Sequence, residues 1–348
     1  MRSLLSTLLL PAFVLSILVP SFALASTPSA TQATSKSLPK LSICVFDPLG
    51  ANGTLFNTMK DYRAVAFEWG ADLEPRAYTD EKIAVDDFKA GQCDAALVTG
   101  ARARPFNKFA ATIEAIGAIP DEKMLRTLLA TISGPKAAKY MRSGQYEVAG
   151  VMPAGPIYLF SRDRTIDTVE ELSGKRIATI DYDQASIFLV NHIGASMVPS
   201  NSANFSGKFN NGSVDIAYAP AVAYQPLELY KGLQDNGGIL RFVLAYMDFQ
   251  ILIRADKFPE GFGQKSRTMV AGYFDRVNEF VEKETQAIDP KYWVDLPDEN
   301  KQTYNEMLRD VRIKLRDEGV YDGKMLKLMR KLRCKTNPAA AECSEKLE

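Results

Sequence analysis

Histidine is almost absent from this 348-residue chain, and the common catalytic motifs are missing as well. The single histidine, His192, falls in a helical pattern, where such a side chain is more often a surface or packed residue than a catalytic one. The sequence has no zinc-protease helix motif, no nucleophile-elbow serine, no phosphate-binding glycine loop and no dinucleotide fingerprint. We therefore expect no enzyme, no cofactor and no metal site.

Net charge is absent too, because 42 Lys and Arg residues balance 42 Asp and Glu residues. Nucleic-acid-binding domains carry an excess of basic charge, so no nucleic-acid partner is expected. A long apolar stretch occurs only near the start, over residues 4–19, between Arg2 and a small-residue cleavage site at 23–25. This pattern predicts a cleaved signal peptide over 1–25, a flexible lead over 26–39 and localisation in the periplasm. Nothing later is long and apolar enough to cross a bilayer.

Only four cysteines are present, and they suit an oxidising compartment. Cys334 and Cys343 lie close together around an Asn-Pro turn, which favours a disulfide that closes a C-terminal loop. Cys44 and Cys93 fall on or beside two strands that would be neighbours in a parallel sheet. We expect both disulfides, although Cys44 as a buried apolar side chain and Cys93 as a turn residue is an equal alternative for that pair.

The chain repeats one local pattern of strand, helix, strand, helix and strand. In each copy the first strand ends on an aspartate, and the last strand follows a glycine turn and another aspartate. The same order of parts occurring twice indicates two α/β lobes of like design. The matched segments are 43–47 with 177–181, 70–75 with 194–199, 88–94 with 209–215, and the apolar runs 95–98 with 216–219.

The repeat predicts an α/β protein with the two-lobed fold of type II-like periplasmic binding proteins, each lobe being a mostly parallel sheet flanked by helices. We assign residues 40–150 and about 250–348 to lobe I with its C-terminal helices, and about 151–249 to lobe II. The apolar stretch 146–160 is interrupted by Pro-Ala-Gly-Pro, which favours an extended crossing between the lobes that could serve as a hinge.

Hydrophobic periodicity and turn residues give the remaining elements. Amphipathic patterns near the C-terminus predict helices that brace the two lobes from outside. The predicted elements are strands over 41–46, 71–78 and 95–99, and helices ending near 69 and spanning 80–90, 106–116, 121–132, 184–193, 265–287, 298–318 and 322–333.

Ligands of open α/β sheets bind beyond the carboxyl ends of the strands, so two facing lobes would line a cleft. Asp47 and Asp181 end equivalent strands, although Asp183 has an alternative role as the N-cap of the next helix. Arg102 or Arg104 could clamp an anion, or pair with a nearby acid. Two acids against one arginine favour a ligand with a cationic group, and aromatic side chains could face it or simply fill the core. The candidate ligand-binding residues are Phe46, Asp47, Thr99, Gly100, Arg102, Asp181, Tyr182, Asp183, Tyr218 and Pro220.

The middle of the chain resembles TRAP-transporter periplasmic solute-binding proteins. It contains a Leu-Ser-Gly-Lys-Arg turn at 172–176, a Gly-Ala step at 194–195 and an Asn-Gly-Ser-Val-Asp string at 211–215. Nearly all of the mature chain resembles the AdeT-like solute-binding proteins of Gram-negative bacteria, some of which are labelled RND-type efflux components linked to aminoglycoside resistance. The second resemblance rests on 42–47, 88–94, 102–104, 226–232 and the paired Cys334 and Cys343.

These resemblances imply a periplasmic receptor that captures a small polar solute between its lobes and delivers it to inner-membrane transporter subunits. We expect it to act as a monomer. The alternative is a periplasmic accessory component of an RND-type multidrug or aminoglycoside efflux system, although the chain lacks the membrane spans of such pumps and the long helical hairpin of their adaptors. In TRAP binding proteins an arginine on the strand after the Gly-Lys turn usually holds a substrate carboxylate. This chain has Ala178 there, so we do not expect that device.

Overall fold

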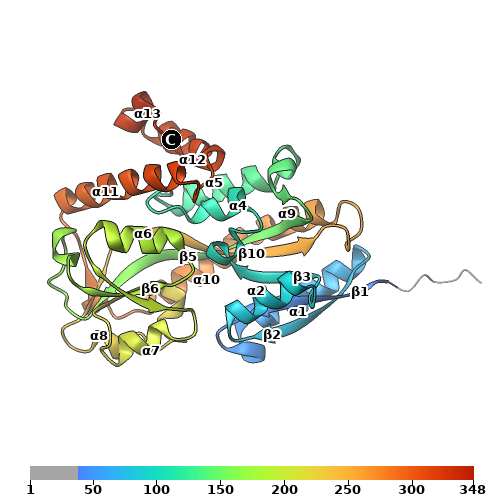
Figure 1. The fold of residues 1–348 in the computed structure, drawn as a ribbon, viewed down its shortest axis with the longest axis horizontal. Coiled ribbons are helices and arrows are strands. Elements are labelled where there is room, and N and C mark those ends of the chain that lie inside the picture. The colour runs from blue at the N-terminus through green and yellow to red at the C-terminus, as the bar shows by residue number, and fades with distance from the viewer. Residues whose placement is uncertain (1–37) are drawn as a thin grey trace, which may run out of the picture. The chain divides into compact units, whose positions relative to one another are not determined.

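The segments that match in the sequence fold into two matching half-sheets (Figure 1). The computed structural model describes residues 38–348, so the predicted signal peptide and nearly all of the predicted lead lie outside the described residues. The strands are β1 (Lys40–Phe46), β2 (Asp72–Tyr78), β3 (Ala95–Thr99), β4 (Arg142–Ser143), β5 (Tyr146–Ser161), β6 (Arg176–Ile180), β7 (Ser196–Ser200), β8 (Ile216–Pro220), β9 (Gly238–Leu240), β10 (Ala245–Arg254) and β11 (Trp293–Val294).

The helices alternate with these strands and then follow them in a C-terminal group. They are α1 (Thr54–Glu68), α2 (Glu81–Ala90), α3 (Gly100–Ala103), α4 (Lys108–Ala111), α5 (Glu122–Ser133), α6 (Gln184–His192), α7 (Phe205–Asn210), α8 (Tyr230–Leu233), α9 (Phe262–Gly272), α10 (Phe274–Gln286), α11 (Asp298–Asp317), α12 (Gly323–Thr336) and α13 (Ala341–Glu345). Within residues 38–348, no helix has the length and apolar character that a bilayer crossing requires.

The strand order is β2-β1-β3-β10-β5-β8-β6-β7, which reads as the same arrangement from either edge. In the first half-sheet β1 pairs in parallel with β2 and β3, and in the second β6 pairs in parallel with β7 and β8. Strands β10 and β5 lie between the half-sheets and run antiparallel to their neighbours. The repeat in the sequence is therefore a repeat in the fold.

One aspartate in each half-sheet fixes the register of its first strand. The Asp94 carboxylate accepts a hydrogen bond from the Ser42 amide at 2.9 Å, and the Asp215 carboxylate accepts one from the Arg176 amide at the same distance. The amides of the two aspartates donate in turn to the carbonyls of the same two partners, at 2.9 and 2.8 Å. The aspartates of the repeated Gly-x-x-Asp pattern thus stabilise strand pairing at the edge away from the carboxyl ends.

The two crossing strands are irregular at the same level. Gly155 of β5 has a φ of 98°, which side chains with a Cβ rarely adopt, and the pairing with β10 shifts register between Met247 and Asp248. A Cβ on Gly155 would also lie 2.5 Å from the Val281 side chain, so helix α10 packs directly on this point. The predicted crossing over 146–160 is confirmed as strand β5, whereas the lobe boundaries assigned from the sequence stay a prediction.

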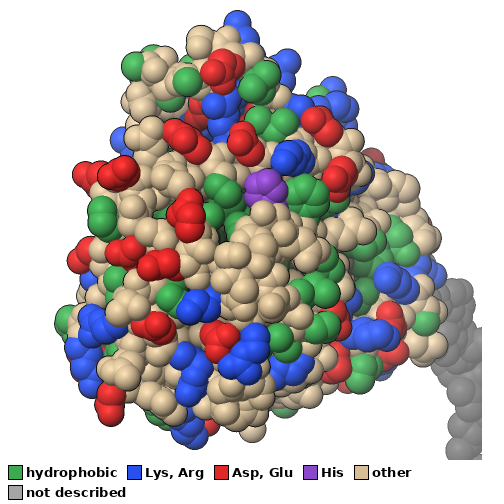
Figure 2. All heavy atoms as spheres, turned by 60° about the vertical axis from the view of Figure 1, so that its left-hand side comes forward, with side chains coloured by type: hydrophobic (Ala, Val, Ile, Leu, Met, Phe, Trp, Pro, Cys, Tyr) green, Lys and Arg blue, Asp and Glu red, His purple; other side chains and the backbone are tan. Residues whose placement is uncertain are grey.

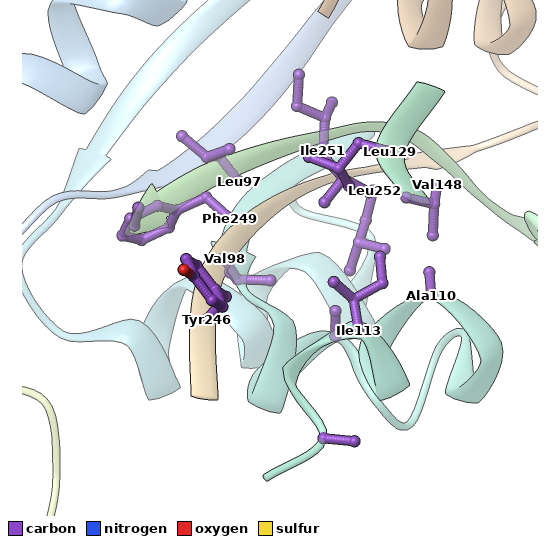
Figure 3. Close-up of a cluster of buried hydrophobic side chains, with 14 of the residues drawn as sticks. Leu97, Val98, Ala110, Ile113, Leu129, Val148, Tyr246, Phe249, Ile251 and Leu252 are labelled. Atoms are coloured by element: carbon purple, nitrogen blue, oxygen red, sulfur yellow. The ribbon is translucent and has the colours of Figure 1, made fainter. Parts of the chain in front are cut away.

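Apolar side chains from β3, β5 and β10 form the centre of the core with those of the helix α5 and of residues 110–113 (Figure 3). Ile43, Val45 and Leu97 are fully buried, as the unbroken apolar runs of β1 and β3 require when both faces of a sheet are covered. Both predicted disulfides are confirmed: Cys44 joins Cys93 between β1 and β3, and Cys334 joins Cys343 between α12 and α13.

The C-terminal helices contact both halves of the protein. On α11, which packs against α6, Tyr304 donates a hydrogen bond to the Thr168 carbonyl at 3.1 Å, while Arg312 further along donates to the Ile116 carbonyl at 2.8 Å. Helices α9 and α10 pack on β5. The predicted bracing role is therefore visible in the contacts, and α11 runs over α6 in Figure 1.

Two predicted helices are interrupted in the structure. The segment 106–116 forms the short α4 and then a 3-10 turn at Thr112–Glu114, because Asn107 caps α4 through the Ala110 amide and holds the Tyr140 carbonyl at 3.0 Å. The segment 265–287 divides at Tyr273 into α9 and α10. His192 lies exposed at the end of α6, where its ring stacks on Phe188, and its side chain is purple in Figure 2.

Candidate ligand-binding cavity

A cavity of about 660 Å³ lies at the carboxyl ends of the two half-sheets. Its wall comes from β1 and α1 in the first half-sheet, from β6, α6 and β8 in the second, and from β10, α10 and α11. Ligand pockets of folded proteins typically have volumes of about 300–1,000 Å³, so the space suits a small organic molecule. Because both half-sheets line it, a ligand here would contact both.

The cavity brings together seven of the ten side chains that the sequence indicated. Those on its wall are Phe46, Asp47, Thr99, Tyr182, Asp183, Tyr218 and Pro220. Gly100, Arg102 and Asp181 do not line it. The ligand-binding role of all ten residues stays a prediction, and the contacts described next separate those free to meet a ligand from those already engaged.

Asp47 is engaged by the backbone at the start of α1. Its carboxylate accepts hydrogen bonds from the Leu49 amide at 2.9 Å and from the Phe56 amide at 3.0 Å, and the residue is 3% exposed. A Cβ at Gly53 would overlap this carboxylate, so the loop needs glycine at that position. Asp47 therefore supplies the cap that Gly53, the N-cap residue of α1, lacks.

In the second half-sheet the same task falls to Asp183 and not to Asp181. Asp183 is the N-cap of α6, and its carboxylate accepts from the Ala185 and Ser186 amides and from the Ser186 hydroxyl at 2.5 Å. Asp181 is exposed and lies outside the cavity. The alternative role considered for Asp183 is thus the one that the structure shows.

A buried contact joins the two carboxyl edges through Glu81 and Tyr182. The Tyr182 hydroxyl donates to a Glu81 carboxylate oxygen at 2.5 Å, and the Thr99 amide donates to the other oxygen at 2.7 Å. The Arg102 guanidinium lies over the Tyr182 ring, 3.2 Å from its centroid, with its Nε 3.8 Å from Glu81. Burial raises the pKa of Glu81, and hydrogen bonds from Tyr182 and Thr99 oppose that rise.

A second contact between the carboxyl edges of the two half-sheets is an ion pair. Arg104 Nη1 lies 2.7 Å from the Asp183 carboxylate, and the two side chains are only 10% and 14% exposed. Pairs this buried are held by geometry and are costly to break on one side. Together, Glu81, Arg102, Arg104, Tyr182 and Asp183 form what we call the clasp.

Two neighbouring carboxyl groups, those of Glu114 and Asp248, lie beside the clasp. Glu114, on the 3-10 turn after α4, lines the cavity and accepts a hydrogen bond from the Asp248 amide at 2.9 Å. Asp248, on β10, is 1% exposed and accepts one hydrogen bond from Gln250 at 3.0 Å. Burial raises the pKa of Asp248 to about 7, and burial together with the Asp248 charge raises the pKa of Glu114 well above its usual range.

The rest of the wall is dominated by apolar and aromatic side chains. They come from α1, β5, β10, α6 and α7, and from helices α9 to α11. Among them are Leu55, Met59, Met152, Leu159, Leu189, Phe205, Met247, Phe249, Met269, Tyr273, Phe280 and Met307. Methionine side chains adapt to irregular apolar shapes and aromatic rings offer large apolar surfaces, so this wall suits a hydrophobic ligand body.

Sequence reasoning weighed Arg104 beside Arg102 but did not select it, and it missed Glu114 and Tyr321. No motif marks Glu114, because its position in the cavity depends on the interruption of the predicted helix over 106–116. Arg102 and Arg104 are separated by one residue on a short helical turn, and only tertiary structure decides which of them reaches the cavity. Across residues 38–348 no group of three or more His, Cys, Asp or Glu side chains could hold a metal ion.

Comparisons of the chain with known proteins agree with this geometry. The model of the family described as Solute-binding protein AdeT 1/2 matches residues 63–348. The chain is 44% identical over 300 residues to "Probable solute-binding protein AdeT1" of Acinetobacter baumannii, covering 86% of this chain and 99% of that one. It is 28% identical over 228 residues to "Probable solute-binding protein AdeT2" of the same organism, covering 66% and 96%.

Solved structures of similar fold include TRAP periplasmic solute-binding proteins. One, from Desulfovibrio salexigens with bound orotic acid, has a TM-score of 0.69 at 15% identity, covering 85% of this chain and 99% of that one. The sugar acid binding protein DctPAm of Advenella mimigardefordensis, in complex with galactonate, has a TM-score of 0.69 at 11% identity and the same coverage. Both resemblances stated from the sequence are confirmed, and so is the two-lobed α/β fold.

Proposed function

Because the chain belongs to the solute-binding protein AdeT 1/2 family, we propose that it captures its solute in the cavity between the half-sheets. The observation that carries this proposal is the cavity of about 660 Å³ at the carboxyl ends of both half-sheets. A ligand there would be enclosed when the clasp is made and released when the halves separate. Binding energy gained from both sides would favour the closed form.

We further propose that the mature chain works in the periplasm, after cleavage of residues 1–25, and hands its solute to inner-membrane transporter subunits. The signal-peptide pattern, the two disulfides and the fold shared with TRAP periplasmic proteins support this location. We also propose that the protein is a monomer that docks on its transporter in the closed form.

The test is a thermal-shift screen of the mature chain, shown by denaturing mass spectrometry to carry no ligand. The compounds are organic acids, amino acids, sugars, polyamines, aminoglycosides and amphipathic amines. A ligand at about one hundred times its dissociation constant stabilises the folded state by about 2.7 kcal/mol, a shift that is readily measured. We expect one class to raise the melting temperature and the others to leave it unchanged.

The control for the site is a pair of variants in which an alanine is replaced by tryptophan. Ala223→Trp places an indole in the cavity that Ala223 lines, whereas Ala64→Trp adds the same group at an exposed position of α1 away from it. Ala223→Trp should abolish the ligand-induced shift, and Ala64→Trp should retain it. If no compound shifts the wild type, or if both variants respond alike, solute capture in this cavity is refuted. The efflux-accessory alternative would then be tested by co-purification with membrane partners.

A further inference from the structure

The charges at one end of the cavity do not balance. Glu114, Asp183 and Asp248 bring three carboxyl groups to this end, and Arg104 brings one guanidinium. Among the described side chains that line the cavity, the other basic one is Arg276, which is exposed. The buried end therefore carries more acid than base.

The one buried cation is already committed. Arg104 is paired with Asp183 at 2.7 Å, and Asp183 also holds the start of α6 and the Ser186 hydroxyl. Asp183 neutralises the charge of Arg104, and the guanidinium Nε has no hydrogen-bond partner among the described residues. A ligand carboxylate at this end would meet one neutralised guanidinium and the two further carboxyl groups of Glu114 and Asp248, which disfavours an organic acid.

The carboxyl group of Glu114, which has no ion-pair partner among the described residues, faces the cavity. Glu114 is part of the wall, and within residues 38–348 its side chain has a single hydrogen bond, from the Asp248 amide. Behind it, Asp248 has one carboxylate oxygen, Oδ2, that is buried and has no partner among the described residues. Two neighbouring carboxyl groups are costly to ionise together in a buried site. The pair therefore needs either a bound proton or a positive charge beside it.

We propose that the solute is an amphipathic organic cation, with an amine beside Glu114 and an apolar body against the methionine and aromatic wall. This inference rests on the proposed function and names the class of ligand for the same cavity. The amine would supply the positive charge that the carboxyl pair lacks, and the apolar body would fill the remainder of the cavity. It refines the small polar solute expected from the sequence to a molecule that is polar at one end only.

Proton release accompanies such binding. Burial and the Asp248 charge raise the pKa of Glu114 well above its usual range, so the empty site keeps a proton to higher pH than an ordinary carboxyl group, and an incoming ammonium group displaces it. The affinity for the amine therefore rises with pH until Glu114 is ionised in the empty site. The charged groups that act on Glu114 are Asp248 on β10, Arg104 after α3 and Asp183 before α6. Gln250 donates a hydrogen bond to Asp248, and Tyr321, before α12, lines the same cavity.

The experiment uses three probes that share one apolar body: phenylbutylamine, phenylbutanol and phenylbutanoate. Dissociation constants are measured by isothermal titration calorimetry on the mature chain between about pH 5 and about pH 8. We expect the amine to bind about tenfold or more tightly than the alcohol, and the carboxylate to bind most weakly. The amine affinity should rise with pH by up to about tenfold per unit, while the alcohol affinity stays constant.

Glu114→Gln is the decisive variant, because it removes the charge and keeps the shape. It should weaken binding of the amine by about tenfold or more, reduce the pH dependence of that binding and leave binding of the alcohol unchanged. Glu68→Gln, at an exposed position at the end of α1, is the matched control and should behave like the wild type.

Three results would overturn the inference: tightest binding of the carboxylate, equal binding of all three probes, or an unchanged amine affinity in Glu114→Gln. A wild type that binds a different class of compound in the thermal-shift screen, with Ala223→Trp abolishing that binding, would overturn the ligand class alone. A wild type that binds nothing would overturn the proposed function as well.

Discussion

Removing a single hydroxyl group from the clasp should loosen the closed form without harming either half. In the substitution Tyr182→Phe, one Glu81 oxygen loses a donor at 2.5 Å and keeps only Arg102, whose Nε is 3.8 Å away. The Glu81 side chain is 0% exposed, so water does not replace the lost donor. Leaving a buried acceptor without its partner costs about 1–3 kcal/mol. Because the contact exists only when the edges meet, the ratio of closed to open molecules should fall by about 5-fold to about 150-fold.

The assay is single-molecule fluorescence energy transfer between dyes on α1 and α7, which belong to different half-sheets. Tyr230→Phe is the control, because Tyr230 is 36% exposed and lies outside the clasp. In a Glu81→Gln background the same change should cost less, since the acceptor no longer carries a charge. A Tyr182→Phe variant with the wild-type distribution of distances would show that the clasp does not hold the halves together.

Two further substitutions test other parts of the structure. Gly53→Ala should lower the free energy of unfolding by about 2–4 kcal/mol in urea titrations, because its Cβ displaces the Asp47 carboxylate from two backbone amides. Gly207→Ala, where a Cβ meets nothing within 4 Å, should change it by less than about 1 kcal/mol. Burial raises the pKa of Asp248 from 3.8 to about 7, so the folded state holds a proton that the unfolded chain releases. Stability should fall as pH rises from about 4 to about 7, and Asp248→Asn should reduce that fall in denaturant titrations.

Each of these results can contradict its premise. Equal stability of the two alanine variants would mean that Asp47 does not depend on Gly53. An undiminished loss of stability with pH in Asp248→Asn would mean that other groups carry the proton.

The sequence predicted the half-sheets well because their information is local. Apolar runs, glycine turns and the repeated aspartates are read within a few residues, and the strand Ala95–Thr99 was found where it occurs. The mirrored strand order, with β5 and β10 between the halves, is visible only in the structure.

The site was less predictable because residues at equivalent positions of the two repeats have different structural roles. Asp47 and Asp181 both end the first strand of their half-sheet, but the cap of the following helix is Asp47 in one and Asp183 in the other. The loop that contains Gly53 lets the chain fold back on Asp47, and the second half-sheet has no such loop. Glu114 could not be found because it depends on contacts between segments far apart in the chain.

The position at which β5 and β10 both lose regular pairing is where we expect the two half-sheets to pivot. Gly155 on β5 pairs with Met247 on β10, and the register shifts directly after Met247, so regular pairing is interrupted on both strands here. Each half-sheet carries one part of the clasp, so a bend here would move the two parts relative to each other. Asp248 is the first residue after the register shift, so its buried carboxyl group lies where such a bend would change its surroundings.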